Sequence, residues 1–210
     1  MISNLAHRAR PQLPGRELSL LARAQRGDVA AFEQLAGGYL GSLFAATLHL
    51  VGDRSEAEDV MQETLLRAWK GIGRFRGRSG FSTWLRRIAI NEVSRSFTKG
   101  TQRPETTLLA DEQLGLSPAT DKGPMGQAED RELRDAVRTA LLALPLPYRT
   151  AVVLRDIEGL STREAAHVAG IGEATLKRRL HQARLKIRAE LCDSPLSAAP
   201  CSARPIQERR

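Results

Sequence analysis

The sequence contains little cysteine and histidine, and these shortages exclude several classes of protein. Its two cysteines among 210 residues, Cys192 and Cys201, both stand near the C-terminal end, so disulfides cannot hold the fold together. The four histidines are scattered without the spacing of metal ligands, whereas a zinc site needs four convergent ligands. We therefore expect no disulfide framework, no metal centre and no cofactor.

Long apolar runs and catalytic motifs are also missing. No stretch approaches the run of about twenty apolar residues that spans a bilayer, and residues 1–16 lack the continuous apolar core of a signal peptide. The chain has no glycine motif that cradles phosphate and no serine or cysteine nucleophile with a nearby base. These absences favour a cytoplasmic protein that is not an enzyme.

Positive charge, by contrast, is in excess. The chain has 32 Lys and Arg against 24 Asp and Glu, which leaves a net charge of +8. Such a basic chain favours a polyanionic partner, and both nucleic acids and membrane surfaces are polyanionic.

Apolar residues recur at three- and four-residue intervals in two parts of the chain, as is typical of amphipathic helices. Between these parts the periodicity stops, and glycine and proline accumulate in a largely polar stretch. The pattern predicts an all-α fold with two small helical domains. We place the domains at 18–98 and 129–191, a flexible linker at 99–128 and a disordered tail at 192–210.

Serine followed three residues later by glutamate marks two helix starts. Ser55 with Glu58 predicts a capping box and a helix that begins near Ser55. Ser161 with Glu164 predicts a second capping box, which opens a short helix that ends at Gly170. A further helix then begins near residue 173, so the C-terminal domain is predicted to be a helix-turn-helix.

The helix from about residue 173 is apolar on one face and basic around the rest, and beyond its first turn Glu190 is the single acidic residue among its cations. Such a helix can lie in the major groove of DNA and contact bases and phosphates. The alternative is a solvated surface helix, but the capped helix and the glycine turn before it favour DNA. The predicted apolar stripe is Leu176, Leu180, Ala183 and Ile187.

The C-terminal domain contains the motifs LPLPYR at 144–149, EGLS at 158–161, EAA at 164–166 and ATLKRRLHQAR at 174–184. These motifs resemble region four of the extracytoplasmic-function (ECF) sigma factors, which give bacterial RNA polymerase its promoter specificity. The resemblance implies that this domain reads the minus-thirty-five promoter element. The predicted contacts are Thr175, Lys177, Arg178, Arg179, His181, Arg184, Lys186 and Arg188.

The segment GDRSEAEDVMQETLLRAW at 52–69 resembles the region-two helix with which sigma factors grip the clamp helices of the largest polymerase subunit. On a helix, one polar face of this segment lies opposite an apolar stripe and can meet a partner without disturbing the core. A solvated acidic face is the alternative for this surface taken alone. The predicted contacts with core polymerase are Asp59, Gln62, Glu63, Leu66 and Lys70.

The segment FRGRSGFSTWLRRIAIN at 75–91 is similar to the loop and helix with which the family binds the minus-ten element. Glycines, cations and aromatic rings supply close backbone approach, charge for phosphates and a surface for an unstacked base. Trp84 fits a core position better than a base platform, and Phe81 could equally be a hydrophobic staple for its helix. The predicted contacts are Arg76, Arg78, Phe81, Arg86, Arg87 and Asn91.

Both resemblances together predict an ECF sigma factor that binds core RNA polymerase and promoter DNA and directs promoter-specific initiation. The family also implies an anti-sigma factor as a regulatory partner. The alternative is a stand-alone helix-turn-helix regulator whose N-terminal half senses a ligand or dimerises. That alternative leaves the motif at 53–69 unexplained.

Overall fold

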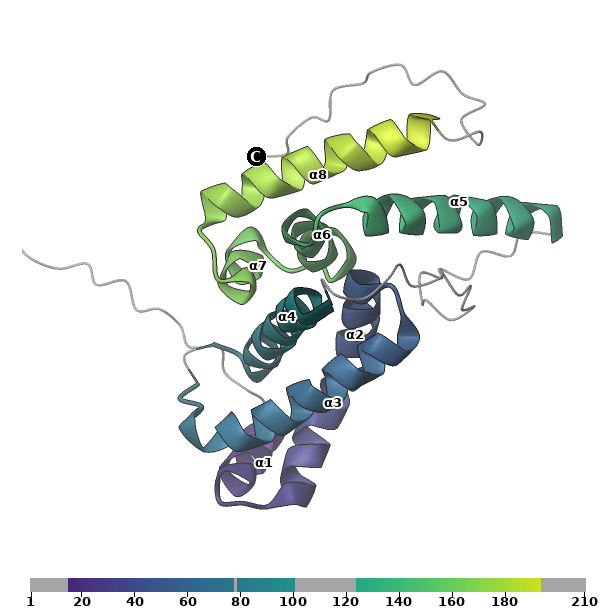
Figure 1. The fold of residues 1–210 in the computed structure, drawn as a ribbon. Helices are drawn as coiled ribbons and strands as arrows, with labels where there is room; N and C mark the ends of the chain where they lie inside the picture. Colours follow the sequence, from purple (N-terminus) through teal and green to yellow (C-terminus); the bar gives the residue numbers. More distant parts are fainter. Residues whose placement is uncertain (1–14, 78, 101–123, 194–210) are drawn as a thin grey trace, which may run out of the picture.

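The computed structural model describes residues 15–77, 79–100 and 124–193, and these residues form helices and short turns without a strand (Figure 1). This confirms the all-α prediction. The N-terminal helices are α1 (Gly15–Gln25), α2 (Val29–Val51), α3 (Arg54–Gly71), the 3-10 helix η1 (Ile72–Arg74) and α4 (Phe81–Gly100). The C-terminal helices are α5 (Pro124–Ala143), α6 (Leu146–Val152), the π-helical η2 (Val153–Ile157), α7 (Thr162–Ala169) and α8 (Glu173–Asp193).

Helix α2 is bounded by residues that suit helix ends. Asp28 precedes the helix in an extended conformation, and its carboxylate accepts a hydrogen bond from the N–H of Ala31 at 3.0 Å. Gly52 ends the helix with a φ of 85°, which favours glycine, and its N–H donates to the carbonyl of Leu48 at 2.8 Å. The chain therefore turns sharply from α2 into α3.

The start of α3 differs in detail from the prediction. Asp53 caps the helix, because its carboxylate accepts a hydrogen bond from the N–H of Glu56 at 2.8 Å. Glu58 is paired with Arg54 at 3.0 Å instead of with the predicted serine. Aspartate caps a helix as well as serine does. Because Asp53 precedes Ser55 and caps the helix, Ser55 already lies inside the first turn and cannot be the cap. The helix start near Ser55 is confirmed, and its capping box is wrong.

The N-terminal helices enclose a core of their own. Its buried side chains come from every one of these α-helices and include Leu21, Phe32, Met61 and Leu85. The turn that follows α3 is tied to this core by Gln25, whose side-chain amide donates to the carbonyls of Phe75 at 2.8 Å and of Ile72 at 3.3 Å. The loop before α4 therefore begins from a fixed position.

The predicted helix-turn-helix is confirmed in α7 and α8. The hydroxyl of Ser161 accepts a hydrogen bond from the N–H of Glu164 at 3.2 Å, and the Glu164 carboxylate accepts one from the N–H of Ser161 at 3.0 Å. Gly170 ends α7 with a φ of 67°. Helix α8 then buries Leu176, Leu180 and Ala183, with Ile187 partly buried beside them.

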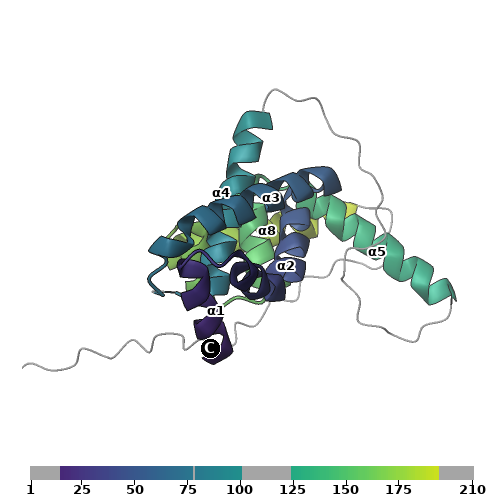
Figure 2. The ribbon, with the colours of Figure 1, turned by 90° about the horizontal axis from the view of Figure 1, so that it is seen from below.

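The C-terminal helices are docked onto the N-terminal helices. One buried cluster combines Leu50 of α2 and Val93 of α4 with Leu141, Val153 and Leu154 from the C-terminal part. Figure 1 shows α6 and α7 between α8 and the N-terminal helices, with α7 against α4. Figure 2 shows α5 extending from this body. The apolar core is therefore continuous between the two predicted domains.

The predicted linker and tail lie largely outside the described residues, at 101–123 and 194–210. Helix α5 begins at Pro124, earlier than the predicted domain boundary at residue 129. Proline suits a first helical position, because the N–H that it lacks would have no partner within the helix. Among the described residues, no helix combines the length and apolarity needed to cross a membrane.

Buried His49 should make the protein less stable in acid. His49 is only 6% exposed, and burial, together with the charge of Arg138, lowers the pKa of its imidazole from 6.5 to about 4. Between these values the unfolded chain binds more protons, so stability is full above pH 6.5 and falls as the pH approaches 4. When the pH is lowered from 7 to 4.5, the free energy of unfolding measured in urea should fall by roughly 2 kcal/mol more for the native chain than for His49→Gln. Equal losses would contradict this.

Candidate functional site

The predicted polymerase-binding residues lie together on the exposed face of α3. Asp59, Gln62, Glu63 and Lys70 are exposed, and Leu66 exposes 53% of its surface. The opposite face of the helix is buried in the core: Ala57, Val60, Met61, Thr64 and Ala68. A partner can therefore contact the five predicted residues without disturbing the packing of α3.

The predicted minus-ten residues are only partly brought together. Arg76, Arg87 and Asn91 are exposed, and Arg78 lies outside the described residues. Arg86 is different, because its guanidinium pairs with the Glu158 carboxylate from the C-terminal helices at 2.9 Å. In this conformation Arg86 is therefore not available to a phosphate.

Phe81 corrects the prediction at the start of α4. Its side chain is 0% exposed, so it cannot contact DNA in this structure. Its ring centroid lies 5.6 Å from Trp84, 5.8 Å from Tyr39 and 6.0 Å from Phe75. Packing of rings at these distances is typical of an aromatic cluster in a core. Phe81 holds the start of α4 against the N-terminal core, which leaves it out of the DNA-binding set, and Trp84 joins the same cluster.

The basic surface of α8 is largely exposed. Lys177, Arg178, His181 and Arg188 are exposed, whereas Thr175 and Arg179 are half-buried. Because the apolar stripe of α8 is buried against the other C-terminal helices, these side chains project from the free side of the helix.

Two cations of α8 have partners within the protein. Arg184 donates two hydrogen bonds to the Asp156 carboxylate, at 3.0 Å and 2.6 Å, and these bonds raise the pKa of its guanidinium. The Lys186 ammonium lies 5.3 Å from the ring centroid of Tyr148. The sequence alone predicted that the whole basic face of α8 is free, whereas the structure pairs two of its cations within the protein.

Residues 35–103 match Sigma-70 region 2, and residues 134–187 match Sigma-70, region 4. The RNA polymerase sigma-H factor of Pseudomonas aeruginosa is 34% identical over 170 residues, which cover 79% of this chain and 88% of the relative. The ECF RNA polymerase sigma factor SigW of Bacillus subtilis is 32% identical over 180 residues, or 82% of this chain and 95% of SigW. The chain belongs to the ECF sigma factors.

Solved structures agree with this assignment. CnrH, in complex with the cytosolic domain of CnrY, shares 27% identity and a TM-score of 0.62, covering 85% of this sigma factor and 99% of CnrH. The sigma factor RpoE of Bartonella quintana, in complex with the anti-sigma factor NepR, shares 26% identity and a TM-score of 0.60, covering 78% and 98%. The predicted family and fold are confirmed.

Three carboxylates that hold the candidate surfaces of this sigma factor were missed in the sequence: Glu92, Asp156 and Glu158. Glu92 is 5% exposed, and its carboxylate forms an ion pair with the guanidinium of Arg67 in α3 at 2.9 Å, which ties α3 to α4. A signal for it exists, because residues 85, 89 and 92 fall on one helical face and the first two are apolar. Asp156 and Glu158 carry no local signal, since their partners are distant in sequence.

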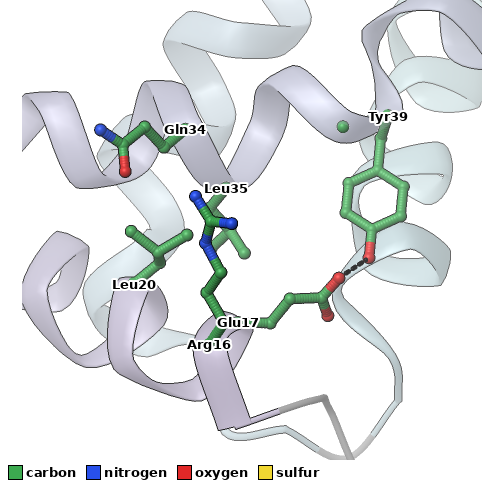
Figure 3. Close-up of a pocket in the computed structure, with 7 residues that line it drawn as sticks. Arg16, Glu17, Leu20, Gln34, Leu35 and Tyr39 are labelled. Carbon is green, nitrogen blue, oxygen red and sulfur yellow. Dashed lines mark hydrogen bonds between the residues drawn. The ribbon is translucent and has the colours of Figure 1, made fainter.

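A hollow of about 340 Å³ lies between α1 and α2 of this sigma factor (Figure 3). Its apolar lining includes Leu20 and Leu35, and the Tyr39 hydroxyl donates a hydrogen bond to the Glu17 carboxylate at 2.8 Å. Burial and this bond raise the pKa of Tyr39 to about 12, so the hydroxyl keeps its proton. The bond holds α1 against α2 and places Tyr39 beside Phe81.

Proposed function

We propose that this sigma factor binds core RNA polymerase and directs initiation at a specific set of promoters. The observation that carries the proposal is the exposed face of α3, where all five residues implied by the family resemblance lie together. The protein acts by binding rather than by catalysis, and it acts in the cytoplasm, where polymerase and promoters are found.

The polymerase-binding surface consists of Asp59, Gln62, Glu63, Leu66 and Lys70. A leucine that is half exposed among charged side chains can be buried by a protein partner, while the charges around it set orientation and exclude other partners. The clamp helices of the largest polymerase subunit are the partner implied by the resemblance. The ion pair between Arg67 and Glu92 keeps this helix in place beneath the surface.

The proposed minus-ten contacts come from the loop before α4 and from α4 itself: Arg76, Arg78, Arg86, Arg87 and Asn91. Cations along this segment suit the phosphates of a separated strand, and Asn91 adds hydrogen-bonding groups for a base. Phe81 has no part in this set because it is buried.

The proposed minus-thirty-five contacts lie along α8. Thr175, Lys177, Arg178, Arg179 and His181 are in its N-terminal half, which enters the major groove first in helix-turn-helix proteins. Lys186 and Arg188 lie further along and suit phosphates. Arg184 is paired with Asp156, so it contributes charge near the DNA while it also joins α8 to η2.

An anti-sigma factor is a further proposed partner. The solved structures of CnrH and of RpoE from Bartonella quintana are complexes with the cytosolic domain of CnrY and with the anti-sigma factor NepR. We extend this kind of partner to the present chain on the strength of the similar folds. The stand-alone regulator is not favoured, because residues 35–103 match Sigma-70 region 2, which a stand-alone regulator would not need.

Run-off transcription on a genomic library tests the proposed function. Adding the protein to purified core polymerase should produce initiation at a subset of promoters that core polymerase alone does not use. Arg178→Ala should cost about 1–3 kcal/mol at one position of the upstream element and relax preference there. Arg188→Ala, the matched control, should weaken all promoters alike. Initiation no higher than with core polymerase alone would refute the function, and identical effects of both variants would refute base reading by α8.

A further inference from the structure

One face of α4 is covered by the C-terminal helices. Residues Arg86, Ile90, Val93 and Phe97 recur at the spacing of a single helical face. Val93 belongs to the buried cluster that includes the C-terminal core, and Ile90 and Phe97 pack against that cluster. Three apolar side chains and one cation of α4 are therefore shielded from water by helices that follow the linker.

The C-terminal end of α2 is held by two arginines from the same helices. Arg149 donates hydrogen bonds to the carbonyl of Leu50 in α2, to that of Leu142 in the last turn of α5 and to that of Leu144 just after α5. Arg138 of α5 donates to the carbonyl of Gly52 at 3.0 Å. Carbonyls at a helix end have no partner within the helix, so these guanidinium groups satisfy acceptors that would otherwise need water.

The ion pair between Arg86 and Glu158 closes the contact between α4 and the turn before α7. The two hydrogen-bonding distances are 2.9 Å and 3.0 Å, and the side chains are only 16% and 8% exposed. Ion pairs that are largely buried are screened little by salt, and removal of one partner leaves an unpaired charge. This contact is thus specific to the docked arrangement.

The docked arrangement is too small to reach both promoter elements. A compact chain of this length has a radius of gyration of about 17 Å, which corresponds to a body roughly 45 Å across. Elements centred near positions minus ten and minus thirty-five are separated by about 85 Å of duplex, at about 3.4 Å per base pair. Reaching both elements therefore requires the C-terminal helices to leave α4.

We propose that the docked C-terminal helices lock the free protein in a closed state, and that the pair between Arg86 and Glu158 is the lock that promoter DNA replaces. A guanidinium paired with a carboxylate cannot at the same time make a bidentate contact with a phosphate. Closure thus removes a minus-ten contact and shortens the reach to the minus-thirty-five element in one step. The functional half of this inference rests on the proposed function, whereas the closed state itself does not.

A closed state lowers the apparent affinity for any partner that binds only the open state. If one molecule in ten to one in a hundred is open, the apparent affinity falls by about ten- to a hundredfold. An unlocked variant should recover that factor. The strength of the lock would thereby determine what fraction of the free sigma factor is able to bind polymerase.

Four proteins test the lock: the native chain, Glu158→Arg, Arg86→Glu, and the double variant with both changes. Small-angle X-ray scattering of each free, full-length chain should give a radius of gyration that is larger by about a quarter or more in both single variants, because like charges then face each other in a confined site. The double variant restores an ion pair of opposite polarity and should return to the native value. Glu33→Arg, an exposed change of equal charge on α2, is the matched control and should leave the radius unchanged.

The same proteins should differ in their affinity for core polymerase. Glu158→Arg should bind about tenfold or more tightly than the native chain, and the double variant should return to native affinity. Arg86→Glu should gain in polymerase affinity but lose promoter opening, because it removes a proposed DNA contact. Circular dichroism should give equal helix content for all of them, which excludes unfolding as the cause of a larger radius.

The results distinguish the lock from the proposed function. An equal radius of gyration for the native chain and Glu158→Arg, or a double variant that stays expanded, would overturn the lock even if every protein binds polymerase. Expansion on Glu158→Arg with rescue in the double variant would establish the closed state, and failure of all four to bind polymerase would then count against the function alone.

Discussion

Reversing the charge at Asp59 should reduce the affinity of this sigma factor for core polymerase at least tenfold, or by about 1.4 kcal/mol and more. Asp59 lies on the exposed face of α3, with Gln62, Glu63 and Leu66 beside it. An arginine there would bring a positive charge to the proposed polymerase-binding surface at a position where the native chain presents a negative one. Run-off transcription by Asp59→Arg should fall with the loss of polymerase binding.

The fold should tolerate this change, because the opposite face of α3 carries the packing. Met61 and Ala68 are buried there, and Thr64, on the same face, is 0% exposed. Substitutions at exposed positions usually change stability by no more than about 0.5 kcal/mol. Circular dichroism and the urea midpoint of Asp59→Arg should therefore match those of the native chain.

Asp135→Arg is the matched control for Asp59→Arg, since it makes the same change of charge at an exposed position of α5. Pull-down on immobilised core polymerase should retain this control as well as it retains the native chain. If Asp59→Arg were retained equally well, the exposed face of α3 would not be the polymerase-binding surface. Loss of both variants together would indicate a general effect of charge.

Phe81→Ala should destabilise the protein by about 3–5 kcal/mol, which is the usual cost of removing a buried phenylalanine ring. The ring is 0% exposed and packs with Tyr39, Phe75 and Trp84, so its loss leaves a cavity among rigid neighbours. A loss of that size is a large share of the stability of an ordinary domain. Urea unfolding followed by circular dichroism measures it.

Arg87→Ala separates a role in the core from a role in DNA binding. Arg87 is exposed on the same helix and is a proposed minus-ten contact, so its loss should weaken promoter opening with little change in stability. Phe81→Ala should show the opposite pattern, because its main effect should be on stability. If Phe81→Ala kept native stability and lost promoter opening, the burial of Phe81 would not describe the active protein.

The sequence by itself determined the helices and the family. Periodicity and end signals located α7 and α8, because a capping box and a glycine with positive φ act over four or five residues and need no distant partner. The motifs at 52–69 and 144–184 indicated regions two and four, and the matches to both regions confirm them. The exposed face of α3 also followed from spacing alone, since the helical repeat separates the two faces.

Tertiary structure alone decided which side chains on those faces are covered. Arg86 and Glu158 are 72 residues apart, and Arg149 and Leu50 are 99 residues apart, so no local pattern could pair them. Phe81 fitted a DNA contact and a core position equally well until the neighbouring rings enclosed it. Helical spacing specifies the direction in which a side chain points, whereas the packing of distant helices decides whether water, DNA or protein meets it.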